Sequence, residues 1–325
     1  MTHARVPLNI FGVGFGLAGL ATTWRIAADL GLAPAGFANA LVVLATAVWV
    51  ASMVLYVSYV AVSVGNLARD LHDMTGGPFA SLAVIVPLLL VVDGVQPYAP
   101  HLAQVLVDIL VVAVVALGGW FTGSWMRGGT ELDRLHPGYF LPTVAGGFIA
   151  SAAAAEVGQV QLSQMMFGLG FVCWTIVGSM ILGRLVFRPP LPDALVPTMA
   201  IEMAPAAVAS LALFFASDGQ VTTPLALLAG YGLLMVAAQL PLLPRYRALS
   251  FSLGTWAFTF SWAAVASAGL LWIAAESPPG EKAWSYVLLA AITVLIGAIA
   301  TRTLVAIAHH TLLPLPATAP NPVSV

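Results

Sequence analysis

Ten long apolar stretches, joined by short connections, restrict what this chain can fold into more than any other feature. A helix needs about 20 apolar residues to cross the hydrocarbon core of a bilayer. Only 7% of the 325 residues are Asp, Glu, Lys or Arg, whereas a soluble domain carries about 25%. These charges are too few to cover a water-exposed surface, so we predict an all-α integral membrane protein. The predicted spans are residues 7–27, 37–64, 79–96, 102–124, 138–156, 162–187, 196–217, 223–243, 250–274 and 283–308.

The basic residues predict the orientation of these ten spans. If the spans alternate in direction, the side of the membrane that holds the N-terminus also receives nine of the eleven basic residues, namely Arg5, Arg69, Arg127, Arg134, Arg184, Arg188, Arg245, Arg247 and Arg302. The other side receives only Arg25 and Lys282. Basic loops remain in the cytoplasm. Both termini are therefore predicted to be cytoplasmic, with the protein in the cytoplasmic membrane.

Odd-numbered and even-numbered spans differ in their helix-breaking and small residues. The first span contains four glycines, and the third, fifth and seventh contain Pro87, Pro142 and Pro205. A proline inside a helix frees a carbonyl group that lipid cannot satisfy, so such a helix is better placed against protein or a water-filled cavity. The alternation predicts five helical hairpins whose odd helices form an inner ring around a central pore. The alternative is that these are ordinary packing kinks.

Ionisable residues within the spans are few, and each is a candidate functional site. Glu202 lies three residues before Pro205 and shares its helix face, so it is either a pore-lining, proton-sensing carboxylate or a hydrogen-bonded structural one. Asp108 is interpreted as structural. Asp93 precedes Gly94 and Pro97 and is interpreted as marking the end of its helix.

The pattern of reactive side chains argues against an enzyme. No two of the six histidines are four residues apart, and Cys173 is the single cysteine. We therefore expect no catalytic residue, no metal and no other cofactor. Residues 1–311 are predicted to form one transmembrane domain. The proline-rich residues 312–325 are predicted to be a disordered tail.

Several segments resemble the tellurite-resistance/dicarboxylate transporter family, which includes the bacterial TehA proteins and the plant guard-cell slow anion channels. The segment HPGYFLPTVAGGFIASA, residues 136–152, is similar to the fifth-helix motif of that family. MAPAAVAS at residues 203–210, WAFTFSWA at 256–263 and FGVGFGLAGLA at 11–21 fall at matching helices. The resemblance extends over all ten helices.

This resemblance implies a transport function and a set of functional residues. It implies a pore formed by the odd helices, commonly in a homotrimer, and closed by an aromatic gate on the ninth helix. By its position in WAFTF the gate is Phe260, with Phe258 as the nearby alternative. The implied lining includes Gly14, Pro87, Pro142 and Pro205. A phenyl ring in a narrow apolar tube blocks ions by its bulk and by dewetting.

Three functions remain open from the sequence. The leading hypothesis is an anion channel or transporter for small inorganic or organic anions. The second is a proton-coupled carrier for four-carbon dicarboxylates, sulfite or tellurite, with Glu202 as the coupling residue. The third is a non-conducting membrane sensor or scaffold.

Overall fold

A computed structural model describes residues 5–217 and 219–312 of the chain. Within these residues every regular element is helical, and ten helices are long and apolar enough to cross a membrane. The predicted all-α membrane architecture is confirmed. Apart from Leu312, the tail that was predicted to be disordered lies outside the described residues. The spans are Leu8–Asp29, Ala35–Val62, Gly77–Gly94, Pro100–Met126, Pro137–Glu156, Val160–Phe187, Val196–Ala216, Thr223–Arg247, Leu253–Glu276 and Glu281–Ala308.

The ten spans form an inner and an outer set. In each odd-numbered span, 50–83% of the most apolar window is buried, against 17–28% in each even-numbered span. The inner set contains α1 (Phe11–Asp29), α4 (Leu82–Gly94), α6 (Gly146–Glu156), α8 (Ala204–Ala216) and α11 (Ala257–Glu276). The outer set contains α2 (Ala35–Val62), α5 (Pro100–Met126), α7 (Val160–Phe187), α9 (Thr223–Ala238) and α12 (Glu281–Ala308). The prediction that the odd helices form the interior is confirmed.

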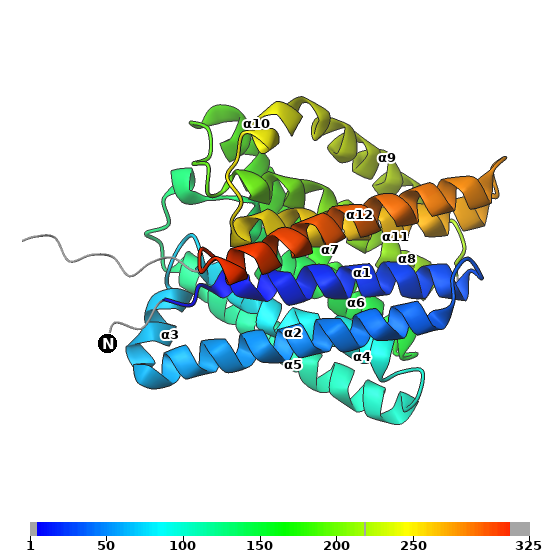
Figure 1. Ribbon diagram of the computed structural model, residues 1–325, viewed down its shortest axis with the longest axis horizontal. Helices are drawn as coiled ribbons and strands as arrows, with labels where there is room; N and C mark the ends of the chain where they lie inside the picture. The colour runs from blue at the N-terminus through cyan, green and yellow to red at the C-terminus, as the bar shows by residue number, and fades with distance from the viewer. Residues whose placement is uncertain (1–4, 218, 313–325) are drawn as a thin grey trace, which may run out of the picture.

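The five inner helices close into a ring. Along the chain α1 contacts α4, α4 contacts α6, α6 contacts α8 and α8 contacts α11, and α11 returns to contact α1. Each ring helix also packs against the outer helix that follows it, which gives five hairpins. Figure 1 shows α1 flanked by the outer helices α2 and α12.

Each ring helix enters the bundle through a turn of 3₁₀-helix. These turns are Leu8–Ile10, Gly77–Ser81, Pro137–Phe140, Val196–Met203 and Leu253–Trp256. Three of them have proline at their first or second position, where the missing N–H costs no hydrogen bond. The same feature recurs in all five hairpins, at the same end of the ring, although sequence identity between the hairpins is weak.

The three prolines that were expected inside helices occupy three different settings. Pro87 does lie inside α4. Pro142 lies in a π-helical turn, Leu141–Ala145, that precedes α6. Pro205 lies in the first turn of α8, directly after the 3₁₀ segment. Because the first N–H groups of a helix have no intrahelical partner, Pro205 begins an α-helix rather than kinking one.

Two short helices follow outer helices at the end of the bundle that holds the N-terminal segment. They are α3 (Val64–Leu71), after α2, and α10 (Leu243–Arg247), after α9. The sequence predicted one span to residue 64, whereas α2 ends at Val62 and the chain turns at Ser63, which is extended (φ −158°). Neither short helix was expected from the hydropathy pattern.

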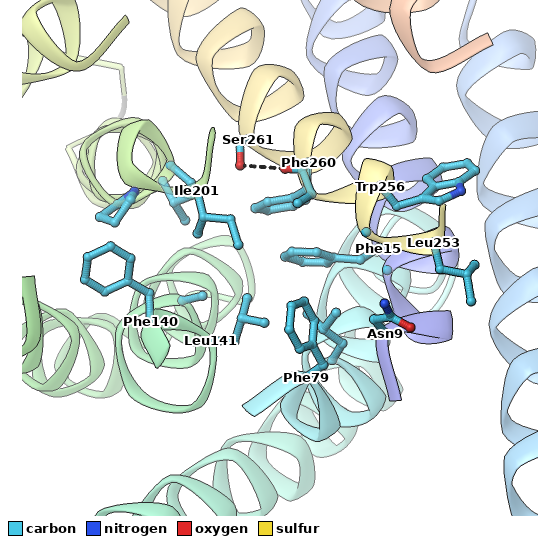
Figure 2. A pocket seen from close by; sticks show the side chains of 18 of the residues that line it. Asn9, Phe15, Phe79, Phe140, Leu141, Ile201, Leu253, Trp256, Phe260 and Ser261 are labelled. Atoms are coloured by element: carbon cyan, nitrogen blue, oxygen red, sulfur yellow. Dashed lines mark hydrogen bonds between the residues drawn. The ribbon is translucent and has the colours of Figure 1, made fainter. Parts of the chain in front are cut away.

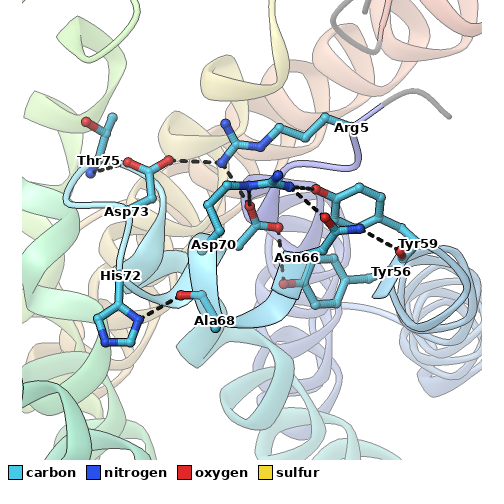
Figure 3. A network of polar contacts seen from close by, with 10 residues as sticks. Arg5, Tyr56, Tyr59, Asn66, Ala68, Asp70, His72, Asp73 and Thr75 are labelled. Atoms are coloured by element: carbon cyan, nitrogen blue, oxygen red, sulfur yellow. Dashed lines mark hydrogen bonds and ion pairs between the residues drawn. The ribbon is translucent and has the colours of Figure 1, made fainter. Parts of the chain in front are cut away.

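A polar network ties α3 to the N-terminal segment (Figure 3). The guanidinium of Arg5 donates to Asp70 and to Asp73, each at 3.0 Å. Asp70 is buried and also accepts from the hydroxyl group of Tyr56 at 3.4 Å. A buried carboxylate needs such partners, so this network fixes where the chain enters α1 relative to α2 and α3.

A buried histidine holds the entry to α6 in place. The backbone N–H of Gly138 donates to Nδ1 of His136 at 3.1 Å, so Nε2 carries the proton and faces the carbonyl oxygen of Thr75 at 3.1 Å. Burial lowers the pKa of His136 to about 4 because it disfavours the charged form. The HPGYF motif therefore begins with a neutral imidazole that links the turn before α6 to the loop before α4.

Candidate functional site

Two small cavities lie on the axis of the inner ring. The inner cavity, toward the end that holds the chain termini, is lined by Phe15, Leu82, Phe148, Pro205 and Ser261, among others. The outer cavity, toward the opposite end, is lined by Thr22, Asp93, Glu156, Leu211 and Ser267, among others. All five ring segments contribute to each cavity. Each has a volume of about 40 Å³, which is room for only a few water molecules.

Phe260 separates the two cavities. It lines both of them, a property that it shares only with Val208 among the lining residues. Its side chain is buried, with 8% of the residue exposed. Its ring therefore lies where the linings of the two cavities meet.

The ring of Phe260 is stacked on a second phenyl ring, that of Phe15 in α1. The ring centroids are 3.6 Å apart and the planes differ by 15°. Figure 2 shows the two rings face to face in the space between the ring helices, with Phe79 beside Phe15 and Phe140 on the opposite side of that space. The wall of the inner cavity is therefore almost entirely apolar. The hydroxyl group of Ser261 is occupied in donating to the carbonyl oxygen of Ala257, at 3.1 Å.

The ionisable side chains in the two linings are all acidic. Neither lining contains Arg, Lys or His, and the outer cavity contains Asp93 and Glu156. Asp93 is 5% exposed and accepts from the hydroxyl group of Thr22 at 2.6 Å. Arg25 donates to the backbone oxygen of Asp93 at 2.8 Å and to Asn39. A permeating anion would meet no fixed cation on the axis, and it would meet two carboxyl groups at the outer end.

The structure distributes the sequence-predicted site residues over two groups. Phe260 and Pro205 line the axial cavities. Gly14, Pro87, Pro142 and Phe258 do not. A Cβ atom on Gly14 would lie 3.4 Å from Trp49, so Gly14 faces α2. The ring of Phe258 packs edge-on against Tyr246 in α10, with centroids 4.8 Å apart.

Glu202 also lies off the axis. It is in the 3₁₀ segment that precedes α8 and is 7% exposed. Its Oε1 atom is buried and has no hydrogen-bond partner among the described residues. Its neighbour Ile201 lines the inner cavity, but Glu202 is absent from both linings.

The sequence analysis did not single out Glu156, the last residue of the predicted fifth span, or Phe15, although both line the axial cavities. Asp93 does mark the end of its helix, since α4 ends at Gly94. It is also buried and lines the outer cavity, which was not predicted. Asp108, by contrast, lies on the outer helix α5 and accepts from Gln159 at 2.7 Å. Among the described residues, His, Cys, Asp and Glu form no group of three or more that could hold a metal ion.

Comparison with known proteins identifies the family to which this chain belongs. The model of the voltage-dependent anion channel (SLAC1) family matches residues 5–304. The chain is also similar to the tellurite resistance protein TehA homolog of Haemophilus influenzae. The two are 28% identical over 263 residues, which cover 81% of this chain and 80% of that protein. The resemblance seen in the sequence motifs is confirmed. The chain belongs to the voltage-dependent anion channel (SLAC1) family.

Proposed function

We propose that this protein conducts small anions across the cytoplasmic membrane along the axis of its inner ring, and that Phe260 is the gate. Family membership implies anion channel or transport activity rather than enzymatic activity. The observation that supports the gate is that Phe260 alone among the aromatic residues lines both axial cavities. Selectivity then depends on pore width and on the cost of dehydrating the anion, because the described residues that line the two cavities include no Arg, Lys or His.

The setting of the pore follows from the same proposal. Both termini face the cytoplasm, which agrees with the nine-to-two division of the basic residues. A homotrimer is the expected assembly, and the broad apolar surface of the outer helices is compatible with it. Chloride, nitrate, malate, sulfite and tellurite are the candidate solutes. A panel of these anions in proteoliposomes would rank them.

Truncation of the gate tests the proposal. In reconstituted bilayers, Phe260→Ala is expected to raise anion conductance at least tenfold, because removal of the ring joins the two cavities. Phe258→Ala is the matched comparison on the same helix, and its conductance should stay near that of the parent protein, since its ring packs against Tyr246. A folded Phe260→Ala protein with no gain would exclude Phe260 as the gate. No flux of any anion from either variant would favour the sensor or scaffold hypothesis.

A proton-coupled carrier is the second candidate, because the buried Oε1 atom of Glu202 has no partner among the described residues. If Glu202 couples transport to protons, Glu202→Gln should abolish the dependence of uptake on a pH gradient while leaving downhill flux. Asp108→Asn, on the outer helix α5, should leave that dependence intact. Transport that ignores the gradient in the parent protein and survives Glu202→Gln would eliminate coupling.

A further inference from the structure

We propose that the gate contains a second aromatic residue, Phe15, and that the closed pore is blocked by a pair of stacked rings rather than by Phe260 alone. This inference rests on the proposed function of Phe260. It assigns to α1 a direct part in closing the pore, which neither the fold nor the motifs of the chain identify. We call the Phe15–Phe260 pair the two-ring plug.

The position of Phe15 on α1 is the first argument. Gly12 and Phe15 line the inner cavity, and Gly19 and Thr22 line the outer one. These residues recur at helical spacing and form the axial face of α1. Phe15 is the one aromatic residue on this face. It sits between the glycines at the depth where the two cavities meet.

The contact between the rings is the second argument. The rings of Phe15 and Phe260 come from helices on adjacent sides of the ring and lie face to face, with centroids 3.6 Å apart. In Figure 2 both rings project into the space enclosed by the ring helices, so each occupies part of the cross-section. Phe15 is itself 6% exposed, and a packed ring of this kind has few free rotamers.

The space on the other side of Phe260 is the third argument. A Cβ atom on Gly19 would lie 2.9 Å from Cδ2 of Phe260 and 3.1 Å from Cβ of Ala263. Gly19 therefore lets the gate ring lie against α1, one turn beyond Phe15. Phe260 is thus held along α1 by a stacked ring on one side and a fitted glycine on the other. When the gate opens, the Phe260 ring must therefore either separate from the Phe15 ring or move together with it.

The two-ring plug has a consequence for gate mutants. When Phe260 is shortened to alanine, the Phe15 ring loses its stacking partner but remains inside the lumen. It then has room to turn toward the axis, so the single truncation opens the pore only in part. Removal of both rings should clear the cross-section.

The experiment compares anion flux in proteoliposomes for Phe260→Ala and for Phe15→Ala/Phe260→Ala. The double variant is expected to conduct at least about twofold more than Phe260→Ala, because it also removes the ring that remains in the lumen after the single truncation. Phe11→Leu/Phe260→Ala is the matched control. Phe11 is buried on the same helix but packs against Tyr56 of α2, away from both cavities, so it should conduct as Phe260→Ala does.

A second double variant, which preserves most of the side-chain volume at position 15, keeps the test valid if Phe15→Ala/Phe260→Ala does not fold. Phe15→Leu/Phe260→Ala retains an apolar side chain of similar bulk but cannot lie flat across the lumen, so its flux should also exceed that of Phe260→Ala. If Phe260→Ala conducts and neither Phe15 variant adds to it, the two-ring plug is overturned while the Phe260 gate stands. If Phe260→Ala and both double variants fold but none of them conducts anions, the gate and the two-ring plug are overturned together.

Discussion

In alkaline solution, where both carboxyl groups of the outer cavity are ionised, neutralising them by substitution should raise anion flux by at least about tenfold in a protein whose gate is open. The change is Asp93→Asn together with Glu156→Gln, made in the Phe260→Ala background. A carboxylate and a monovalent anion about 8 Å apart repel by about 2 kcal/mol at an effective dielectric constant near 20. Since 1.4 kcal/mol corresponds to about tenfold in rate, the two groups are a large barrier when both are ionised, because the described residues that line the axis include no Arg, Lys or His.

The dependence on pH gives this prediction a second readout. Protons from the outer solution neutralise the same carboxyl groups that the substitutions remove. The ratio of variant flux to parent flux should therefore be largest in alkaline solution and should shrink as the outer solution is acidified.

The substitutions are chosen to leave the structure intact. Asp93 accepts from the hydroxyl group of Thr22 at 2.6 Å, and in the Asp93→Asn variant the side-chain amide oxygen can still accept that hydrogen bond. Asp108→Asn is the matched control, because Asp108 lies on the outer helix α5 and bonds to Gln159. A double variant that conducts like its parent at every pH would mean that permeating anions do not experience these charges.

The acidic outer end has a regularity that is visible in the sequence once the ring helices are known. Four of the five ring spans have an acidic residue at their last or second-last position: Asp29, Asp93, Glu156 and Glu276. A hydropathy analysis treats these residues as span boundaries, because a charge is what ends an apolar stretch. Their common position at one end of the ring emerges only when the hairpins are superposed as equivalent units.

The fold was predictable because its determinants are properties of long segments. Length and apolarity define ten spans, and the interior prolines of the third, fifth and seventh spans, with the clustered glycines of the first, separate the inner ring from the outer one. These signals depend on the solvent that each helix meets, so they survive weak sequence identity between the hairpins.

The axial face of each ring helix was not predictable in the same way. Pro142 shares a motif with residues that line the inner cavity, yet its carbonyl oxygen lies 3.0 Å from where a Cβ atom of Gly118 in α5 would be. Phe15 is an apolar residue in an apolar helix, and only its contact with the distant ring of Phe260 distinguishes it. The side of a helix that faces the axis is decided by packing between helices. The residue pattern within one helix therefore does not identify that side.

Replacing Gly16 by alanine should destabilise the protein by about 2 kcal/mol, within the usual cost of overpacking a core. A Cβ atom on Gly16 would lie 2.0 Å from Oγ1 and 2.7 Å from Cβ of Thr259, and 2.9 Å from the ring of Trp256. Thr259 is fully buried, and its hydroxyl group donates to the carbonyl oxygen of Trp256 at 2.6 Å. The added methyl group cannot be accommodated unless α1 and α11 move apart, because small residues set how closely two helices approach.

Gly12→Ala is the control for this prediction. Gly12 lies one turn earlier on α1 and faces the same partner, but its Cβ atom would meet Cβ of Trp256 at 3.5 Å, an ordinary contact. Alanine also has the higher helix propensity, so Gly12→Ala should melt at or above the temperature of the parent protein in detergent. Gly16→Ala should melt several degrees lower.

The destabilisation by Gly16→Ala should be accompanied by a leak. Gly16 follows Phe15 in α1, and Thr259 precedes Phe260 in α11. A displacement of the two helices that relieves the clash therefore also separates the two stacked rings. Thr259→Ala in the Gly16→Ala protein removes the closest atom and should recover part of both the stability and the closed state. If Gly16→Ala lowers the melting temperature while the pore stays closed, the spacing between α1 and α11 stabilises the bundle without setting the gate.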